Sequence, residues 1–158
     1  MKKLIILNSR EIKRLRELVV KSFGYFFKED YAYLKNDKDK IFIVNKDITR
    51  IELNNLIIDR MGLYFAELKD SQCRLSKEGA QFLVREANKD EAEVKNLVDL
   101  DDKEVKSYFT GIDLPKDLGE ENHLVIIKYQ DNILGCAQYK NGQILNFLPK
   151  IHRGEVII

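Results

Sequence analysis

The chain has 158 residues, of which 44% are hydrophobic and 34% are charged, so it can bury a core and is not disordered by composition. No run approaches the roughly 20 apolar residues of a membrane-spanning helix, and the apolar start at 4–7 is too short for a signal peptide, which predicts a cytoplasmic protein without membrane contact. The net charge of +1 divides into +6 over 1–85, −7 over 86–121 and +2 over 122–158. Because charges act locally in salt solution, the acidic middle does not exclude a basic surface that binds nucleic acid.

The first predicted element is a helix that begins at Ser9 as its N-cap and ends at Gly24. Its buried side is expected to hold four apolar residues: Ile12, Leu15, Val19 and Val20. Its other side carries five cations: Arg10, Lys13, Arg14, Arg16 and Lys21. This basic side is a candidate patch for an anionic partner, although an ordinary solvated helix surface explains it better.

Short β-prone runs separated by charged turns follow, and they predict a meander with strands at Tyr25–Phe27, Tyr31–Leu34 and Ile41–Val44. Asp47 is expected to cap a short helical turn through Ile51. Another strand or an irregular pair is expected at 56–58 and 62–66, and Ser76 is the expected N-cap of a helix through Val84. The first half is therefore predicted to be an α+β module.

The composition turns acidic and loses its apolar periodicity between Glu86 and Glu93, which predicts a boundary between two domains, at 1–88 and 94–158. Because no Pro- or Gly-rich linker marks this boundary, the two parts are expected to pack closely. The second part is predicted to open with a strand over 94–100.

A helix is expected from Asp101 or Asp102 until Gly111 stops it. The later strands are predicted at 123–129, 133–139, 144–148 and 156–158. Asn141-Gly142, inside a four-residue connection, is a strong hairpin signal. One helix followed by several short strands predicts a small closed or nearly closed barrel, so the expected fold class is α+β, with an α+β module before a β-barrel.

No group of residues predicts catalysis. Cys73 and Cys136 lie one in each half without a partner pair at zinc-ligand spacing, and we expect both to be buried thiols. His123 and His152 have no nucleophile motif around them, and the glycines form no phosphate-binding loop. The sequence therefore predicts no enzyme, no catalytic residue, no metal and no cofactor.

The second half resembles a known RNA-binding family. Residues 98–114, a strand followed by a short helix and a glycine-bearing loop, are similar to the opening of PUA domains. Residues 134–150, with a Leu-Gly pair, a glycine-bearing turn and a final Asn-x-x-Pro-Lys run, look like the PUA-like tail of the Nop/Sun (Fmu) family of RNA cytosine methyltransferases. This resemblance covers about 94–154 and implies a PUA-like barrel.

In that family the tail follows a methyltransferase domain with a Gly-rich S-adenosylmethionine loop and a catalytic Cys beside a Pro. This chain has neither, because no proline adjoins Cys73 or Cys136. The resemblance therefore implies a stand-alone relative with an added N-terminal (pre-PUA) domain, a layout that also resembles the Nip-type ribosome assembly factors.

The segment 132–154 is the predicted RNA-binding segment, because it contains three cations and no acid: Lys140, Lys150 and Arg153. Such a segment can meet phosphates without internal repulsion. Tyr139 and His152 are candidate stacking groups for unpaired bases. Three cations near a C-terminus are otherwise explained as a solvated surface, and the resemblance favours the RNA-binding interpretation.

The resemblance adds three further candidates. PUA domains use the helix and its following loop as one wall of the RNA groove, which implies roles for Lys106 and Gly111. Asn146 belongs to the Asn-x-x-Pro-Lys run. Without the resemblance, Gly111 and Lys106 would be a helix C-cap and a surface lysine.

The resemblance implies non-catalytic binding of structured RNA, with ribosomal RNA as the expected class, by an accessory factor in ribosome biogenesis, rRNA processing or RNA modification. The alternative is a protein-interaction adaptor for a separately encoded RNA methyltransferase or ribosome assembly factor, through the acidic segment 86–121. A weaker alternative is a small-molecule-binding barrel, which would require a large closed apolar pocket.

Overall fold

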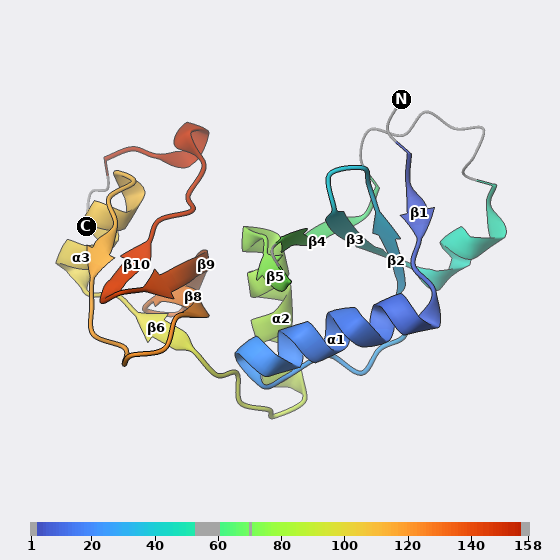
Figure 1. The fold of residues 1–158 in the computed structure, drawn as a ribbon, viewed down its shortest axis with the longest axis horizontal. Helices are drawn as coiled ribbons and strands as arrows, with labels where there is room; N and C mark the ends of the chain where they lie inside the picture. Colours follow the sequence, from blue (N-terminus) through green and yellow to red (C-terminus); the bar gives the residue numbers. More distant parts are fainter. Residues whose placement is uncertain (1–2, 53–60, 70, 156–158) are drawn as a thin grey trace.

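The computed structural model describes residues 3–52, 61–69 and 71–155, and within these ranges the chain forms two five-stranded sheets in an α+β fold (Figure 1). The N-terminal sheet has the antiparallel order β1-β2-β3-β4-β5. Its strands are β1 (Ile5–Ile6), β2 (Ala32–Lys35), β3 (Lys40–Val44), β4 (Leu63–Lys69) and β5 (Gln72–Leu75). Two of the three predicted meander strands are thus confirmed, as β2 and β3, and β1 and β5 are edge strands that were not predicted.

The helix α1 (Ser9–Phe23) has a different N-cap from the predicted one. Asn8 caps it, because Asn8 Oδ1 accepts the N–H of Glu11 while the Glu11 carboxylate accepts the N–H of Asn8, both at 2.9 Å. The prediction of Ser9 as N-cap was wrong by one residue. Gly24 ends the helix in the left-handed region at φ +73°, as predicted.

The buried stripe of α1 also differs by one position. Leu15, Val19 and Phe23 are buried, whereas the predicted core residue Val20 is 42% exposed. A spacing of four residues keeps these three side chains on one side of the helix, and Val20 lies 100° away from Val19. Leu15, Val19 and Phe23 belong to the core cluster that also holds residues of the N-terminal sheet.

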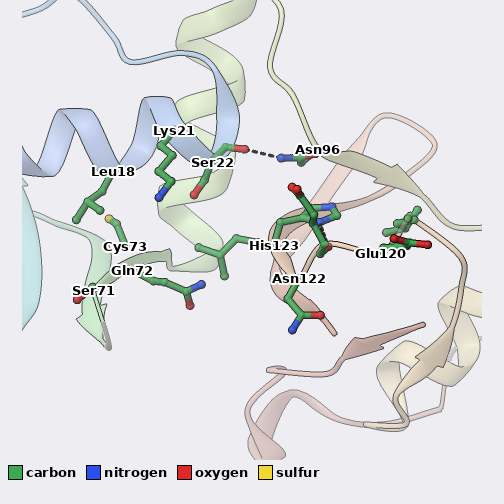
Figure 2. A pocket seen from close by; sticks show the side chains of 14 residues that line it. Leu18, Lys21, Ser22, Ser71, Gln72, Cys73, Asn96, Glu120, Asn122 and His123 are labelled. Carbon is green, nitrogen blue, oxygen red and sulfur yellow. Dashed lines mark hydrogen bonds between the residues drawn. The ribbon is translucent and has the colours of Figure 1, made fainter. Parts of the chain in front are cut away.

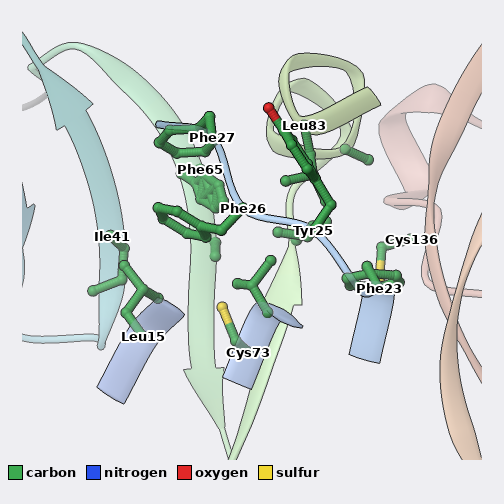
Figure 3. Packing of buried hydrophobic residues seen from close by; sticks show 14 of the residues in the cluster. Leu15, Phe23, Tyr25, Phe26, Phe27, Ile41, Phe65, Cys73, Leu83 and Cys136 are labelled. Carbon is green, nitrogen blue, oxygen red and sulfur yellow. The ribbon is translucent and has the colours of Figure 1, made fainter. Parts of the chain in front are cut away.

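The predicted strand at 25–27 is wrong. The segment has no regular secondary structure and pairs with no strand in the described part of the chain. Its three aromatic side chains fill the core instead (Figure 3). The ring of Phe27 lies with its centroid 5.7 Å from that of Phe65 and 5.0 Å from that of Phe82, in edge-to-face arrangements.

One further prediction in the first half needs correction. The short helix η1 (Lys46–Arg50) is capped by Asn45, whose side chain accepts the N–H of Asp47, so Asp47 is not the cap. The segment predicted at 56–58 lies outside the described residues. The strand predicted at 62–66 is confirmed as β4.

The helix α2 (Lys77–Lys89) has the predicted N-cap, since Ser76 Oγ accepts the N–H of Gly79 at 2.8 Å. It continues past the predicted end at Val84, into the start of the acidic segment. Glu86 is buried there and pairs with Lys89, Nζ to Oε1, at 3.2 Å. An acidic residue therefore does not mark the end of this helix.

The C-terminal sheet curls into a half-barrel in the order β6-β8-β9-β10-β7, with β6 parallel to β8 and the other pairs antiparallel. Its strands are β6 (Leu97–Asp99), β7 (Leu114–Pro115), β8 (His123–Tyr129), β9 (Asn132–Lys140) and β10 (Gln143–Leu145). The strand predictions are confirmed for β8 and β9. They were too long for β6 and β10 and missed β7, and 156–158 lies outside the described residues.

The helix α3 (Asp102–Phe109) precedes β7, and Asp101 caps it together with Glu104 in a second reciprocal pair. Gly111 follows the C-cap at φ +88°, which confirms the predicted stop. A short helix, η3 (Lys150–His152), follows β10.

Two hydrophobic clusters meet at β8. Val125 and Ile127 pack inside the half-barrel, whereas Leu124 and Ile126 belong to the cluster that also holds α1, α2 and the N-terminal sheet. Alternate residues of a strand point to opposite faces of its sheet, so β8 is buried on both. The two halves are therefore packed closely, as predicted.

Candidate functional site

Contacts at the end of α3 involve three of the predicted RNA-binding residues, Gly111, Asn146 and Arg153, and Lys150 and His152 lie just before Arg153 in η3. The chain after β10 passes over this end, where the N–H of Gly154 donates to Phe109 O at 2.8 Å. Arg153 Nε donates to Leu148 O at 3.1 Å and lies against Gly111, where an added Cβ would come within 2.5 Å of that nitrogen. Gly111 thus leaves space for the Arg153 side chain.

We call this region the α3–η3 end and define it by five of the predicted residues: Lys106, Gly111, Lys150, His152 and Arg153. The four side chains other than glycine are exposed. None of the ion pairs among the described residues involves Lys106, Lys150 or Arg153. By contrast, Lys116 in the acidic segment pairs with Glu104, Nζ to Oε2, at 3.0 Å.

Lys140 lies elsewhere. It is the last residue of β9, at the turn to β10, and the next residue donates its N–H to Asn122 Oδ1 at 3.2 Å. Figure 1 shows η3 well away from this turn. Lys140 therefore borders the loop before β8, so the three cations of the predicted segment 132–154 do not lie in one place.

Tyr139 is not available as a stacking platform. Its side chain is 1% exposed, and its hydroxyl donates to Gly119 O at 2.7 Å. Strand parity explains the correction, since Tyr139 and Ala137 both point into the half-barrel core.

Asn146 has a structural role in the described contacts. Its Nδ2 donates to Tyr108 O at 2.7 Å and to Ile112 O at 3.1 Å, while its Oδ1 accepts the N–H of Leu148 at 2.9 Å. These bonds satisfy carbonyls at the end of α3 and fix the loop behind Gly111. Asn146 therefore shapes the α3–η3 end rather than presenting a free amide to a ligand.

Both cysteines are buried free thiols, as predicted. Burial raises the pKa of Cys73 and of Cys136 to about 12 by disfavouring the thiolate, so neither is an activated nucleophile near neutral pH. Within the described residues, no cluster of three His, Cys, Asp or Glu side chains is placed to hold a metal ion.

In the parts of the chain that the structure describes, every helix is too short or too polar to cross a bilayer.

Comparison with known proteins assigns the C-terminal part. Residues 95–153 match the family model described as the Methyltransferase RsmF PUA domain, and the match leaves 1–94 unassigned. A search of curated proteins found no match to the chain. PUA domains are in general RNA-binding modules without catalytic activity of their own. The segment 95–153 is therefore a PUA-like domain that resembles the C-terminal tail of the Nop/Sun family of methyltransferases.

Proposed function

We propose that the chain binds structured RNA, of ribosomal origin, as a non-catalytic accessory factor in ribosome biogenesis or RNA modification, with the α3–η3 end as the contact. The single observation that carries this proposal is the match of 95–153 to a PUA domain. The domain division proposed with it places an α+β module at 1–88 before the RNA-binding domain at 94–158.

The charges at the α3–η3 end support this location. Lys106, Lys150 and Arg153 are exposed and take part in none of the described ion pairs, so binding a phosphate would break no ion pair within the described residues. His152 is the last residue of η3 and lies between Lys150 and Arg153 in the chain. Its side chain is exposed, which suits stacking on an unpaired base. Neutralised phosphates release counterions, so the affinity should fall as the salt concentration rises.

The test is a filter-binding or gel-shift titration of rRNA fragments with the Lys150→Glu/Arg153→Glu variant. A matched control is Lys28→Glu/Lys38→Glu, which makes the same charge change at two exposed lysines of the N-terminal half. We expect at least a tenfold loss for the first variant and a salt slope reduced by about one per lost phosphate contact. Unchanged affinity and slope would remove the α3–η3 end from the proposal.

A second candidate is an adaptor for a separately encoded RNA methyltransferase or ribosome assembly factor. The exposed carboxylates of the acidic segment support it, among them Glu91, Glu93 and Glu120. A tagged chain that captures a protein partner after complete nuclease digestion, and that binds no rRNA fragment, would favour the adaptor.

A further inference from the structure

A polar cleft of about 600 Å³ opens between the two halves of the chain (Figure 2). One wall comes from α1 and from the β4–β5 hairpin, with Lys21 and Gln72. The other comes from the loop before β8, with Glu120 and Asn122, and from the first residue of β8, His123. The size is that of a small-ligand site, and the cleft lies outside the barrel core.

Hydrogen bonds fix both walls of the cleft. Asn96 Nδ2 donates to Ser22 O at 2.6 Å, which ties the end of α1 to the segment before β6. On the other side, Tyr139 Oη donates to Gly119 O at 2.7 Å, and His123 Nδ1 lies 2.8 Å from Glu121 O. The cleft is therefore formed before any ligand arrives, so little ordering is required on binding.

Several polar groups of the lining have no hydrogen-bond partner among the described residues. Lys21 and Gln72 make no such side-chain bond there. Asn122 uses Oδ1 to accept the N–H of Asn141, which leaves its two Nδ2 protons for a ligand. Donors thus reach the cleft from both walls.

The charges restrict what the cleft can hold. Lys21 lies on one wall, and the side chains of Glu120 and Glu121 belong to the other. A run of phosphates would be repelled by the two carboxylates, but a single phosphate near Lys21 would not be. Carboxylates accept hydrogen bonds from the amino groups of bases, and amides bind base edges with both donors and acceptors.

The rest of α1 leads toward this cleft. At 100° per residue, Arg10, Arg14, Glu17 and Lys21 fall within one stripe of the helix, which therefore carries three cations and one carboxylate, and Lys21 lines the cleft. All three cations are exposed. An RNA backbone along this stripe would bring one nucleotide to the cleft entrance.

We propose that the cleft between the two halves binds one unpaired nucleotide of the RNA, with its phosphate on Lys21 and an amino-bearing base between Gln72 and Asn122. This inference rests on the proposed RNA binding and adds a second contact, separate from the α3–η3 end. Adenine, guanine and cytosine offer an amino group to the carboxylates, whereas uracil does not.

The test compares RNA hairpins that differ by one bulged nucleotide, with full-length protein and fluorescence anisotropy as the readout. We expect a bulged adenosine to tighten binding by about tenfold over the fully paired hairpin, and a bulged uridine to do so much less. Gln72→Ala should reduce the preference for the bulged adenosine by about fivefold. Asn122→Asp, which keeps the Oδ1 acceptor for Asn141 and removes both donors, provides a second variant should Gln72→Ala not fold.

Asn88→Ala is the matched control, since Asn88 is exposed on α2 and does not line the cleft. Equal binding of bulged and paired hairpins, or a preference that survives in both cleft variants, would overturn this inference and leave the proposed RNA binding standing. Failure to bind any hairpin would overturn both. A free nucleotide, AMP, serves as a further arm: saturation by AMP without any bulge preference would identify a small-molecule site and also overturn the inference.

Discussion

Asn146 illustrates how a residue in an RNA-binding segment can act on the protein alone. It makes three side-chain hydrogen bonds: one to the carbonyl of Tyr108 in the last turn of α3, one to the carbonyl of Ile112 after the helix, and one to the N–H of Leu148. An amide side chain that binds an RNA base needs its donors and its acceptor free of hydrogen bonds within the protein. The contribution of Asn146 to binding should therefore be indirect, through the shape of the loop that carries Gly111 and Arg153.

Asn146→Ala should lower the free energy of unfolding by about 2 kcal/mol, because it leaves the carbonyls of Tyr108 and Ile112 without this donor. Asn146→Asp should destabilise at least as much as Asn146→Ala, because a carboxylate oxygen in place of Nδ2 would face the carbonyl oxygens of Tyr108 and Ile112. Urea titration provides the measurement. Asn132→Ala, at an exposed position at the start of β9, is the control and should change stability by less than about 0.5 kcal/mol. Equal stability of Asn146→Ala and wild type would contradict the structural role.

The sequence could predict the exposure of Lys106, Lys150 and Arg153, since lysine and arginine are rarely buried without a partner. It could not predict the burial of Tyr139, because the face of a strand is decided by the strands beside it. Because the sequence does not show which face Tyr139 occupies, the cations near it in the chain favoured the wrong interpretation of Tyr139 as a stacking group. The cleft residue Gln72 had no signal of its own, since the opposite wall of the cleft comes from a segment some 50 residues later in the chain.

At the scale of elements, the contact between α2 and β4 depends on a glycine. Gly79 lies in the first turn of α2, and a Cβ there would come within 1.9 Å of Phe65 O. Backbone cannot move aside as the end of a long side chain can. The helix and the strand therefore approach as closely as only a glycine allows.

Gly79→Ala should destabilise the protein by about 3 kcal/mol, although alanine is the better helix former, because α2 must move away from β4. Thermal unfolding followed by circular dichroism gives the measurement. Gly154→Ala is the matched control, since nothing lies within 4 Å of its added Cβ and its φ is ordinary. A stabilised Gly79→Ala variant would show that the close contact is not maintained in solution.

Elements with strong local signals were predictable, and elements defined by pairing were not. Ser76 and the helix start at 101–102 were recognised from capping residues that act within one turn. The strands β1 and β7 have two residues each and become strands only by pairing, Ile5 with Lys35 and Ile144 with Leu114. Such short runs have no periodicity that a sequence could display.

At the scale of the whole molecule, β8 joins the two halves. Four consecutive buried residues supply both clusters: Leu124 and Ile126 face the N-terminal half, and Val125 and Ile127 face the half-barrel. Cys136 of β9 lies in the N-terminal cluster as well. The side chains of Leu124, Ile126 and Cys136 would be exposed to water if the PUA-like segment stood alone.

The fragment 94–158 should therefore be less stable than the same residues in the full chain. The full chain should unfold in one transition by calorimetry, because the shared faces of β8 and β9 couple the two halves.

The isolated fragment should bind a hydrophobic dye, since burial of an apolar side chain such as Leu124 or Ile126 contributes about 1.5–3 kcal/mol that the fragment loses. Leu124→Ser/Ile126→Ser in the fragment should reduce dye binding, whereas the same change in the full chain should cost several kcal/mol. Two separate transitions in the full chain, with a fragment as stable as the corresponding one, would show instead that each half folds on its own and that the cleft between them is free to open.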